Sequence, residues 1–140
     1  MDVGLEHINW FSVLLGAVIY MVVGGIWYGP IAGKAWMAEM GLTEEEIKAA
    51  GNPTSAMTKS FIAALFLSAG LAFVLSMPAF RDSGWQGGMM TGFILSVLLV
   101  GGGTFPNYAF ENKTLRHFLI HMGCVTIAMM LIGAMMGAWS

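Results

Sequence analysis

The sequence predicts an all-α protein, a four-helix transmembrane bundle with short interfacial helices between the first and second spans. The chain has 140 residues, of which 57% are hydrophobic and only 10% are charged, whereas about a quarter of the residues of a soluble domain are charged. A helix needs about 20 residues to cross a hydrocarbon core about 30 Å thick. These observations exclude a soluble enzyme, a nucleic-acid-binding protein and a disordered chain. The uncharged stretches long enough to cross are residues 7–33, 60–80, 83–110 and 117–140.

The first span is expected at about residues 8–28, because Pro30 follows it and proline lacks the amide donor that a helix needs. The connector 29–59 is the only long polar region. Thr43 and Glu46 have the spacing of a capping box, which begins a helix. The connector is therefore expected to lie on the membrane surface as two short helices. These are predicted at residues 32–40 and 44–50.

The other three spans are expected at about residues 60–80, 87–110 and 117–139. The third is predicted to be irregular, because the glycine cluster 101–103 is followed by Pro106, and such a combination kinks helices. A kink frees backbone carbonyls, which either line a substrate path or are satisfied by neighbouring helices. Both interpretations stay open at this point.

Pairs of glycines at helical spacing occur in the third and fourth spans. Lipid gives no hydrophobic reward for contact between helices, so helices associate where small residues allow close packing. Gly88 with Gly92, and Gly133 with Gly137, are therefore candidate packing positions. They serve either contacts within the chain or contacts between protomers.

The basic residues predict an orientation for the single membrane domain, residues 1–140. Five of the six lie in the connector or between the third and fourth spans, and Arg81 alone lies on the other side. By the positive-inside rule the connector faces the cytoplasm and both termini lie outside. We expect the protein in the inner membrane of a bacterium.

His117, His121 and Cys124 are candidate metal ligands, because their spacing places them on one stripe of a helix. Imidazole and thiolate bind zinc or copper, and histidine also binds haem iron. A simpler role for His121 is a hydrogen bond to a neighbouring helix, for example to Asn107 or Tyr28. In that interpretation Cys124 is a small buried hydrophobic residue.

A polar cluster is expected at the cytoplasmic membrane surface, where the orientation brings the ends of several spans to one depth. Its five candidate ligand residues are Trp27, Tyr28, Asn107, Glu111 and His121. Its other predicted members are Lys59, Ser60, Tyr108 and His117. No Asp, Glu, Lys or Arg lies inside a predicted span, which disfavours ion-coupled transport, since intramembrane charges usually mark ion pathways. No catalytic signature or cofactor motif is present, so the chain is predicted not to be an enzyme.

Four segments resemble the bacterial membrane-protein family called domain of unknown function 1761. The resemblance covers nearly the whole chain and implies four membrane helices with one longer connector after the first. It implies no substrate and no catalytic residue, since the family's activity is not established. The segments are residues 25–30 (GIWYGP), 33–37 (GKAWM), 41–48 (GLTEEEIK) and 107–111 (NYAFE).

The expected function is therefore assembly without catalysis, as a homo-oligomer or as a subunit of a membrane complex, with the lipid bilayer and other membrane subunits as partners. One alternative is a small transporter or channel whose path lies near the irregular third span. Another is a membrane protein that binds a metal or haem through His117, His121 and Cys124.

Overall fold

The computed structural model describes residues 5–51 and 53–139, and every regular element within them is a helix. Four helices are long and apolar enough to cross a membrane, so the predicted all-α class with four spans is confirmed. The spans are Trp10–Ile31, Thr54–Leu75, Gly84–Phe110 and Leu115–Trp139. In order, the elements are η1 (Leu5–His7), α1 (Trp10–Ile26), η2 (Trp27–Ile31), α2 (Gly33–Met40), α3 (Glu44–Ala49), α4 (Thr54–Leu75), α5 (Gly84–Leu95), η3 (Ser96–Gly101), α6 (Gly102–Phe110) and α7 (Leu115–Trp139).

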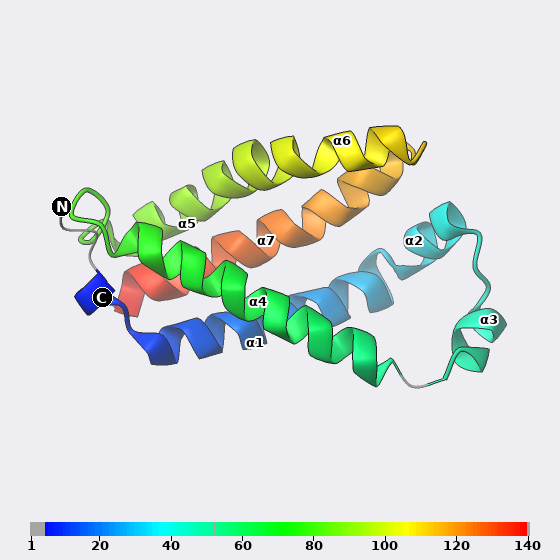
Figure 1. Ribbon diagram of the computed structural model, residues 1–140, viewed down its shortest axis with the longest axis horizontal. Coiled ribbons are helices and arrows are strands. Elements are labelled where there is room, and N and C mark those ends of the chain that lie inside the picture. Colours follow the sequence, from blue (N-terminus) through cyan, green and yellow to red (C-terminus); the bar gives the residue numbers. More distant parts are fainter. Residues whose placement is uncertain (1–4, 52, 140) are drawn as a thin grey trace.

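The four spans lie side by side as long rods (Figure 1). One end of the bundle, called here the terminal end, holds the start of α1, the end of α7 and the connection 76–83. The opposite end, the connector end, holds α2, α3 and the turn 111–114. The predicted charge asymmetry thus separates the two ends of the bundle. Which end faces the cytoplasm stays a prediction.

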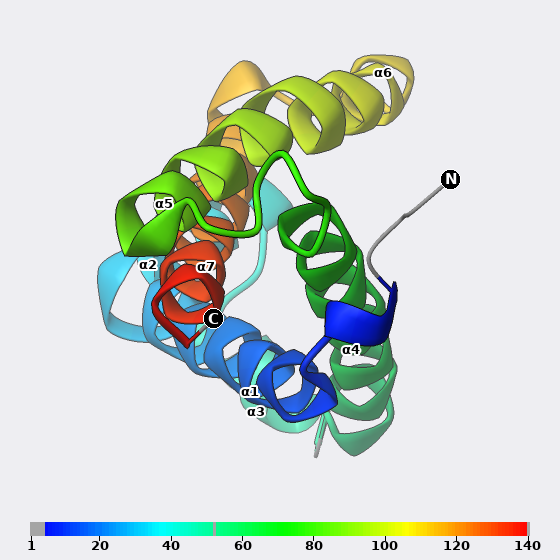
Figure 2. The same ribbon diagram turned by 90° about the vertical axis from the view of Figure 1, so that its left-hand side faces the viewer.

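The fourth span, α7, is the most buried of the four. Its residues Ile132 and Met136 pack with Val13 of α1 and with Leu71 and Leu75 of α4 in the larger core cluster. On another side α7 packs along α5. Figure 2, which looks along the bundle, shows α7 beside both α1 and α5. The core therefore lies around α7, and the third span reaches it from one side only.

The second span differs from its predicted bounds of 60–80, because α4 begins at Thr54 and ends at Leu75. Lys59 consequently lies inside the helix near the connector end, where a long side chain can reach the headgroup layer. At the other end Pro78 cannot continue a helix. Arg81 Nε donates a hydrogen bond of 3.1 Å to the carbonyl of Ser76, which satisfies one of the acceptors that the helix end leaves free.

The prediction that Pro30 stops the first helix is wrong by a short distance. The helix continues through η2 with π-type hydrogen bonds, of which Ala32 N to Trp27 O is 2.6 Å long. A π turn spans one more residue than an α turn, so the helix passes the proline before it ends. Gly33 starts α2 directly afterwards, and a Cβ there would overlap the carbonyl oxygen of Tyr28.

The third span is irregular, but the irregularity begins before the glycine cluster that predicts it. Residues Ser96–Gly101 form the π-helical segment η3, and Pro106 lies inside α6. Ser96 Oγ donates to the carbonyl of Phe93 at 2.9 Å and lies 3.2 Å from Thr126 Oγ1 of α7. A serine that bonds back to its own helix competes with the backbone ladder and bends helices.

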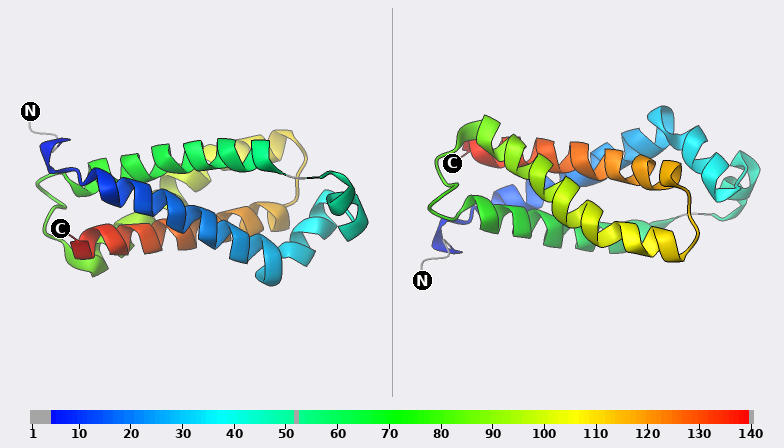
Figure 3. Two further views of the ribbon diagram at one scale, coloured as in Figure 1. Left: turned by 90° about the horizontal axis from the view of Figure 1, so that it is seen from below. Right: turned by 90° about the horizontal axis from the view of Figure 1, so that it is seen from above.

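The connector helices α2 and α3 lie beyond the ends of α1 and α4 (Figure 3). The predicted cap of the second short helix is present, since Thr43 Oγ1 accepts a hydrogen bond from Glu46 N at 3.2 Å. Glu39 of α2 accepts a hydrogen bond of 2.7 Å from Thr114 and lies 3.9 Å from Arg116 Nε. These contacts attach α2 to the start of α7.

Candidate functional site

The predicted polar cluster is brought together only in part. Trp27 Nε1 donates a hydrogen bond of 2.9 Å to the carbonyl of Ile120 on α7. The Trp27 ring also lies over Gly123, where a Cβ would stand 2.6 Å from the ring. Trp27 therefore attaches the end of the first span to α7, and the missing side chain at Gly123 makes room for its ring.

The ring that faces the two histidines belongs to Tyr108, a member of the predicted cluster that is not among its five candidate ligand residues. Its centroid is 5.3 Å from that of His117, edge to face, and 5.9 Å from that of His121, stacked. Asn107, one position earlier, is exposed, because adjacent residues of a helix point about 100° apart. The shared spacing of Phe105 and Tyr108, which both contact Phe118 of α7, is the signal that identifies this face.

Glu111 lies apart from the cluster. It is exposed and pairs with Lys113 over 3.0 Å, and Lys113 Nζ in turn lies 4.9 Å from the centre of the Tyr108 ring. Of the five candidate ligand residues of the cluster, the structure places Tyr28 and His121 around one cavity. Trp27 lies nearby and is hydrogen-bonded to α7. Asn107 and Glu111 face outward.

The candidate metal ligands His117, His121 and Cys124 all lie on α7, but they do not converge as a metal site. Across residues 5–51 and 53–139, no group of three or more His, Cys, Asp and Glu side chains is placed to hold a metal ion. His117 is buried against Tyr108. His121 and Cys124 line a cavity on the side of α7 that faces α1 and α4.

That cavity is the candidate site, called here the inner cavity. It has a volume of about 350 Å³, lies near the connector end and is formed by the first, second and fourth spans. None of its lining residues is Asp, Glu, Lys or Arg. Within the described part of the chain, the side chains of Tyr20, Tyr28, Ser60 and His121 have no hydrogen-bond partner. The lining residues are Tyr20, Met21, Gly24, Gly25, Tyr28, Met57, Ser60, His121, Cys124 and Val125.

A second hollow, called here the lateral groove, lies between the third and fourth spans and has a volume of about 510 Å³. Thr126 is its only hydroxyl-bearing lining residue, and the other lining residues are apolar or glycine, so the groove suits an apolar occupant at membrane depth. It is lined by Phe93, Val97, Gly101, Phe105, Phe118, Leu119, Met122, Gly123, Thr126 and Ile127.

The predicted packing glycines all lie in one contact within the chain, between α5 and α7. A Cβ at Gly88 would overlap the carbonyl oxygen of Gly133, and a Cβ at Gly133 would overlap that of Gly88. Gly92 meets the backbone of Met129, and Gly137 meets that of Gly84. The two helices thus touch backbone to backbone, as small residues permit in membranes.

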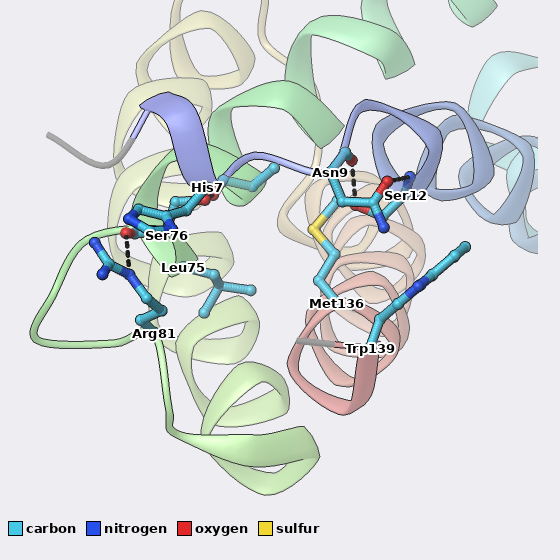
Figure 4. A pocket seen from close by; sticks show the side chains of 9 residues that line it. His7, Asn9, Ser12, Leu75, Ser76, Arg81, Met136 and Trp139 are labelled. Carbon is cyan, nitrogen blue, oxygen red and sulfur yellow. Dashed lines mark hydrogen bonds between the residues drawn. The ribbon is translucent and has the colours of Figure 1, made fainter.

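A small polar pocket at the terminal end was not predicted from the sequence (Figure 4). Its polar groups are largely occupied by helix ends: Asn9 Oδ1 accepts from Phe11 N at 3.0 Å, and Ser12 Oγ donates to the carbonyl of Asn9 at 2.6 Å. Arg81 bonds the end of α4 there. The volume is about 70 Å³, room for about two waters. The isolated position of Arg81 in the sequence is the signal that points to this pocket.

Comparison with known proteins identifies one family, described as "Protein of unknown function (DUF1761)", whose match covers residues 11–137. The match agrees with the resemblance seen in the sequence. No curated protein and no solved structure matches the chain.

Proposed function

We propose that the chain, which belongs to the DUF1761 family of unknown function, acts by assembly in the membrane, as a homo-oligomer or as a subunit of a larger complex, without catalysing a reaction. The observation that supports this most is the open face of the third span. Only Gly88, Gly92, Ser96 and Gly101 of that span are buried, so the span rests on the bundle along a narrow stripe.

The rest of the third span is apolar and uncovered. Leu98 and Leu99, in its middle, are 66% and 67% exposed. The lateral groove lies beside this face and adds to its apolar surface. An uncovered apolar face is compatible with lipid alone, so the case for a protein partner rests on the glycines of the same face.

Two glycines of α6 lie in open space. A Cβ at Gly102 or Gly103 would meet nothing within 4 Å, in contrast to Gly88 and Gly92, which touch α7. Glycine inside a helix costs about 1 kcal/mol relative to alanine. In a membrane, glycine usually offsets that cost by letting another helix approach closely. We therefore assign Gly102 and Gly103 to contact with a partner helix.

The test is the mass of the purified protein in mild detergent. We expect an oligomer, or a complex with a second subunit, that dissociates when Gly102 and Gly103 are both replaced by Leu. Gly70→Leu is the matched control, because Gly70 of α4 is also open but lies on another span. A wild-type protein that is strictly monomeric and carries no partner would contradict the proposal.

Transport is a second candidate, which the π-helical segment Ser96–Gly101 favours, since π segments in helices are frequent at functional sites. Proteoliposomes that contain the protein would then take up one or more solutes from a panel of neutral and charged compounds. The variant Ser96→Ala removes the hydroxyl that contacts Thr126 and should change the rate. Uptake equal to that of empty vesicles counts against this candidate.

A further inference from the structure

We propose that the inner cavity binds an uncharged, membrane-soluble aromatic compound with hydrogen-bonding oxygen atoms, of which a quinone ring is the simplest example. This inference is independent of the assembly proposal, because the inner cavity lies between the first, second and fourth spans and the face proposed for assembly belongs to the third.

The cavity is surrounded by side chains with unused hydrogen-bonding capacity. Tyr20 and Tyr28 come from the first span, Ser60 from α4 and His121 from α7, and within the described residues none of their side chains has a hydrogen-bond partner. Tyr20 lies in the middle of the first span, Trp10–Ile31, where no bulk water replaces a missing partner and an unpaired polar group costs several kcal/mol. Four polar side chains without a partner around one space indicate a guest that bonds to them.

The lining of the cavity also determines the charge of the guest. No residue that lines the inner cavity carries a full charge at pH 7. A carboxylate, phosphate or ammonium group would therefore be transferred from water into the cavity without a counter-charge. The free energy of that transfer is much larger than hydrogen bonds to the neutral lining can offset. The ligand class is uncharged.

The aromatic lining and the volume of the cavity indicate the shape of the guest. The rings of Tyr20, Tyr28 and His121 and the thioethers of Met21 and Met57 line the cavity, and thioether sulfur contacts aromatic rings favourably. The volume of about 350 Å³ lies in the range of small-molecule sites, about 300–1,000 Å³. These features favour a flat aromatic ring.

The cavity is supported from behind and open in front. Tyr108 stacks on His121 with ring centroids 5.9 Å apart, and Trp36 of α2 packs edge to face on Tyr28 at the same distance. Such supporting contacts hold side chains in place before a ligand arrives. Met57 and Ser60 on the α4 side are exposed, so a compound dissolved in the bilayer can enter between α1 and α4.

The rate at which a thiol reagent modifies Cys124, the only cysteine of the chain, measures binding to the cavity. Cys124 lines the inner cavity and is 3% exposed, so a small thiol reagent reaches its sulfur through the cavity. The probe is a fully ring-substituted benzoquinone with a decyl tail, which has no free ring position for attack by the thiol. We expect this quinone to slow the modification of Cys124 at least about tenfold, with saturation as its concentration rises.

Two variants test the site without disturbing the fold. Gly24→Leu fills the cavity, and a Cβ there meets nothing within 4 Å, so protection by the quinone should disappear. Tyr28→Phe removes one hydroxyl and should raise the quinone concentration for half protection about fivefold, the effect of one lost hydrogen bond. Gly70→Leu is the matched control for Gly24→Leu, because Gly70 also lies in open space and does not line the cavity, and protection should stay as in the wild type.

Three results would overturn the proposal: no protection of Cys124, protection that grows linearly without saturation, or protection that Gly24→Leu leaves intact. The mass of each variant in mild detergent is measured in parallel. An unchanged mass with lost protection identifies the cavity as the part affected, whereas a changed mass with intact protection concerns assembly alone.

Discussion

The third and fourth spans contact each other differently in the two halves of the bundle. Toward the terminal end, α5 and α7 touch backbone to backbone at Gly88, Gly92 and Gly133. Toward the connector end, aromatic side chains stand between α6 and α7, with Phe118 edge to face against Phe105 and Tyr108 at centroid distances of 5.0 and 5.4 Å. We call these the glycine half and the aromatic half.

The difference shows how one pair of helices forms a close backbone contact in one half and a groove in the other. Glycines bring the backbones together and leave no room for a ligand. Aromatic rings hold the backbones apart, and the lateral groove, which Phe105 and Phe118 both line, lies in that half. The π-helical segment Ser96–Gly101 lies between the two halves, where the third span changes from one mode of contact to the other.

The largest expected effect on stability comes from a substitution that separates the helices of the glycine half. Gly133→Leu places a side chain on the carbonyl of Gly88, so the helices must separate, and the free energy of unfolding should fall by about 3 kcal/mol or more. Denaturation in mixed detergent micelles, followed by circular dichroism, measures it. Gly70→Leu is the control, since an added side chain there also points into open space and Gly70 is not assigned to a partner contact. Equal stability of the two variants would refute the close contact.

Breaking the aromatic half should cost less. Phe118→Ala removes the ring that contacts both Phe105 and Tyr108, and we expect a loss of about 2 kcal/mol, combining lost ring contacts and the space left behind. The same denaturation experiment measures the loss. Leu119→Ala, a neighbouring exposed residue of α7, is the comparison and should change stability by less than about 0.5 kcal/mol. A larger loss at Leu119 than at Phe118 would show that the rings do not support this half.

The smallest effect is expected at the junction. Ser96→Ala removes the hydroxyl contact with Thr126, and interhelical hydrogen bonds of this kind are worth about 0.6 kcal/mol in membranes. A double-mutant cycle with Thr126→Val isolates the pairwise energy. Coupling near zero would mean that the two hydroxyls are neighbours without bonding.

The sequence predicts those features that depend on local composition. Uncharged stretches predict four spans because charge is excluded from hydrocarbon along the whole length of a helix, and Thr43 with Glu46 predicts a helix start because capping is a local bond. Helix ends are less predictable: Lys59 lies inside α4 because a long basic side chain can reach the headgroups from within a helix, and the helix passes Pro30 because it changes to π bonding there.

The candidate site is harder to predict, because its residues come from three separate spans. Helical spacing places His121 and Cys124 near one another on one helix, but it does not reveal that Tyr20 faces them. Likewise the spacing of Gly88 and Gly92 marks a packing stripe without naming the helix that fills it. In the structure that helix is α7 of the same chain.

The central position of α7 also has a consequence for biosynthesis. The most buried span follows the third span in the chain, so the third span enters the bilayer before its main neighbour exists. During that interval Gly88 and Gly92 face lipid. The fourth span of another copy, inserted nearby, fits these glycines as well as the chain's own, and exchange of identical elements is a low-cost route to dimers. Slow synthesis of the 25 residues of α7 would therefore favour exchanged pairs over single chains.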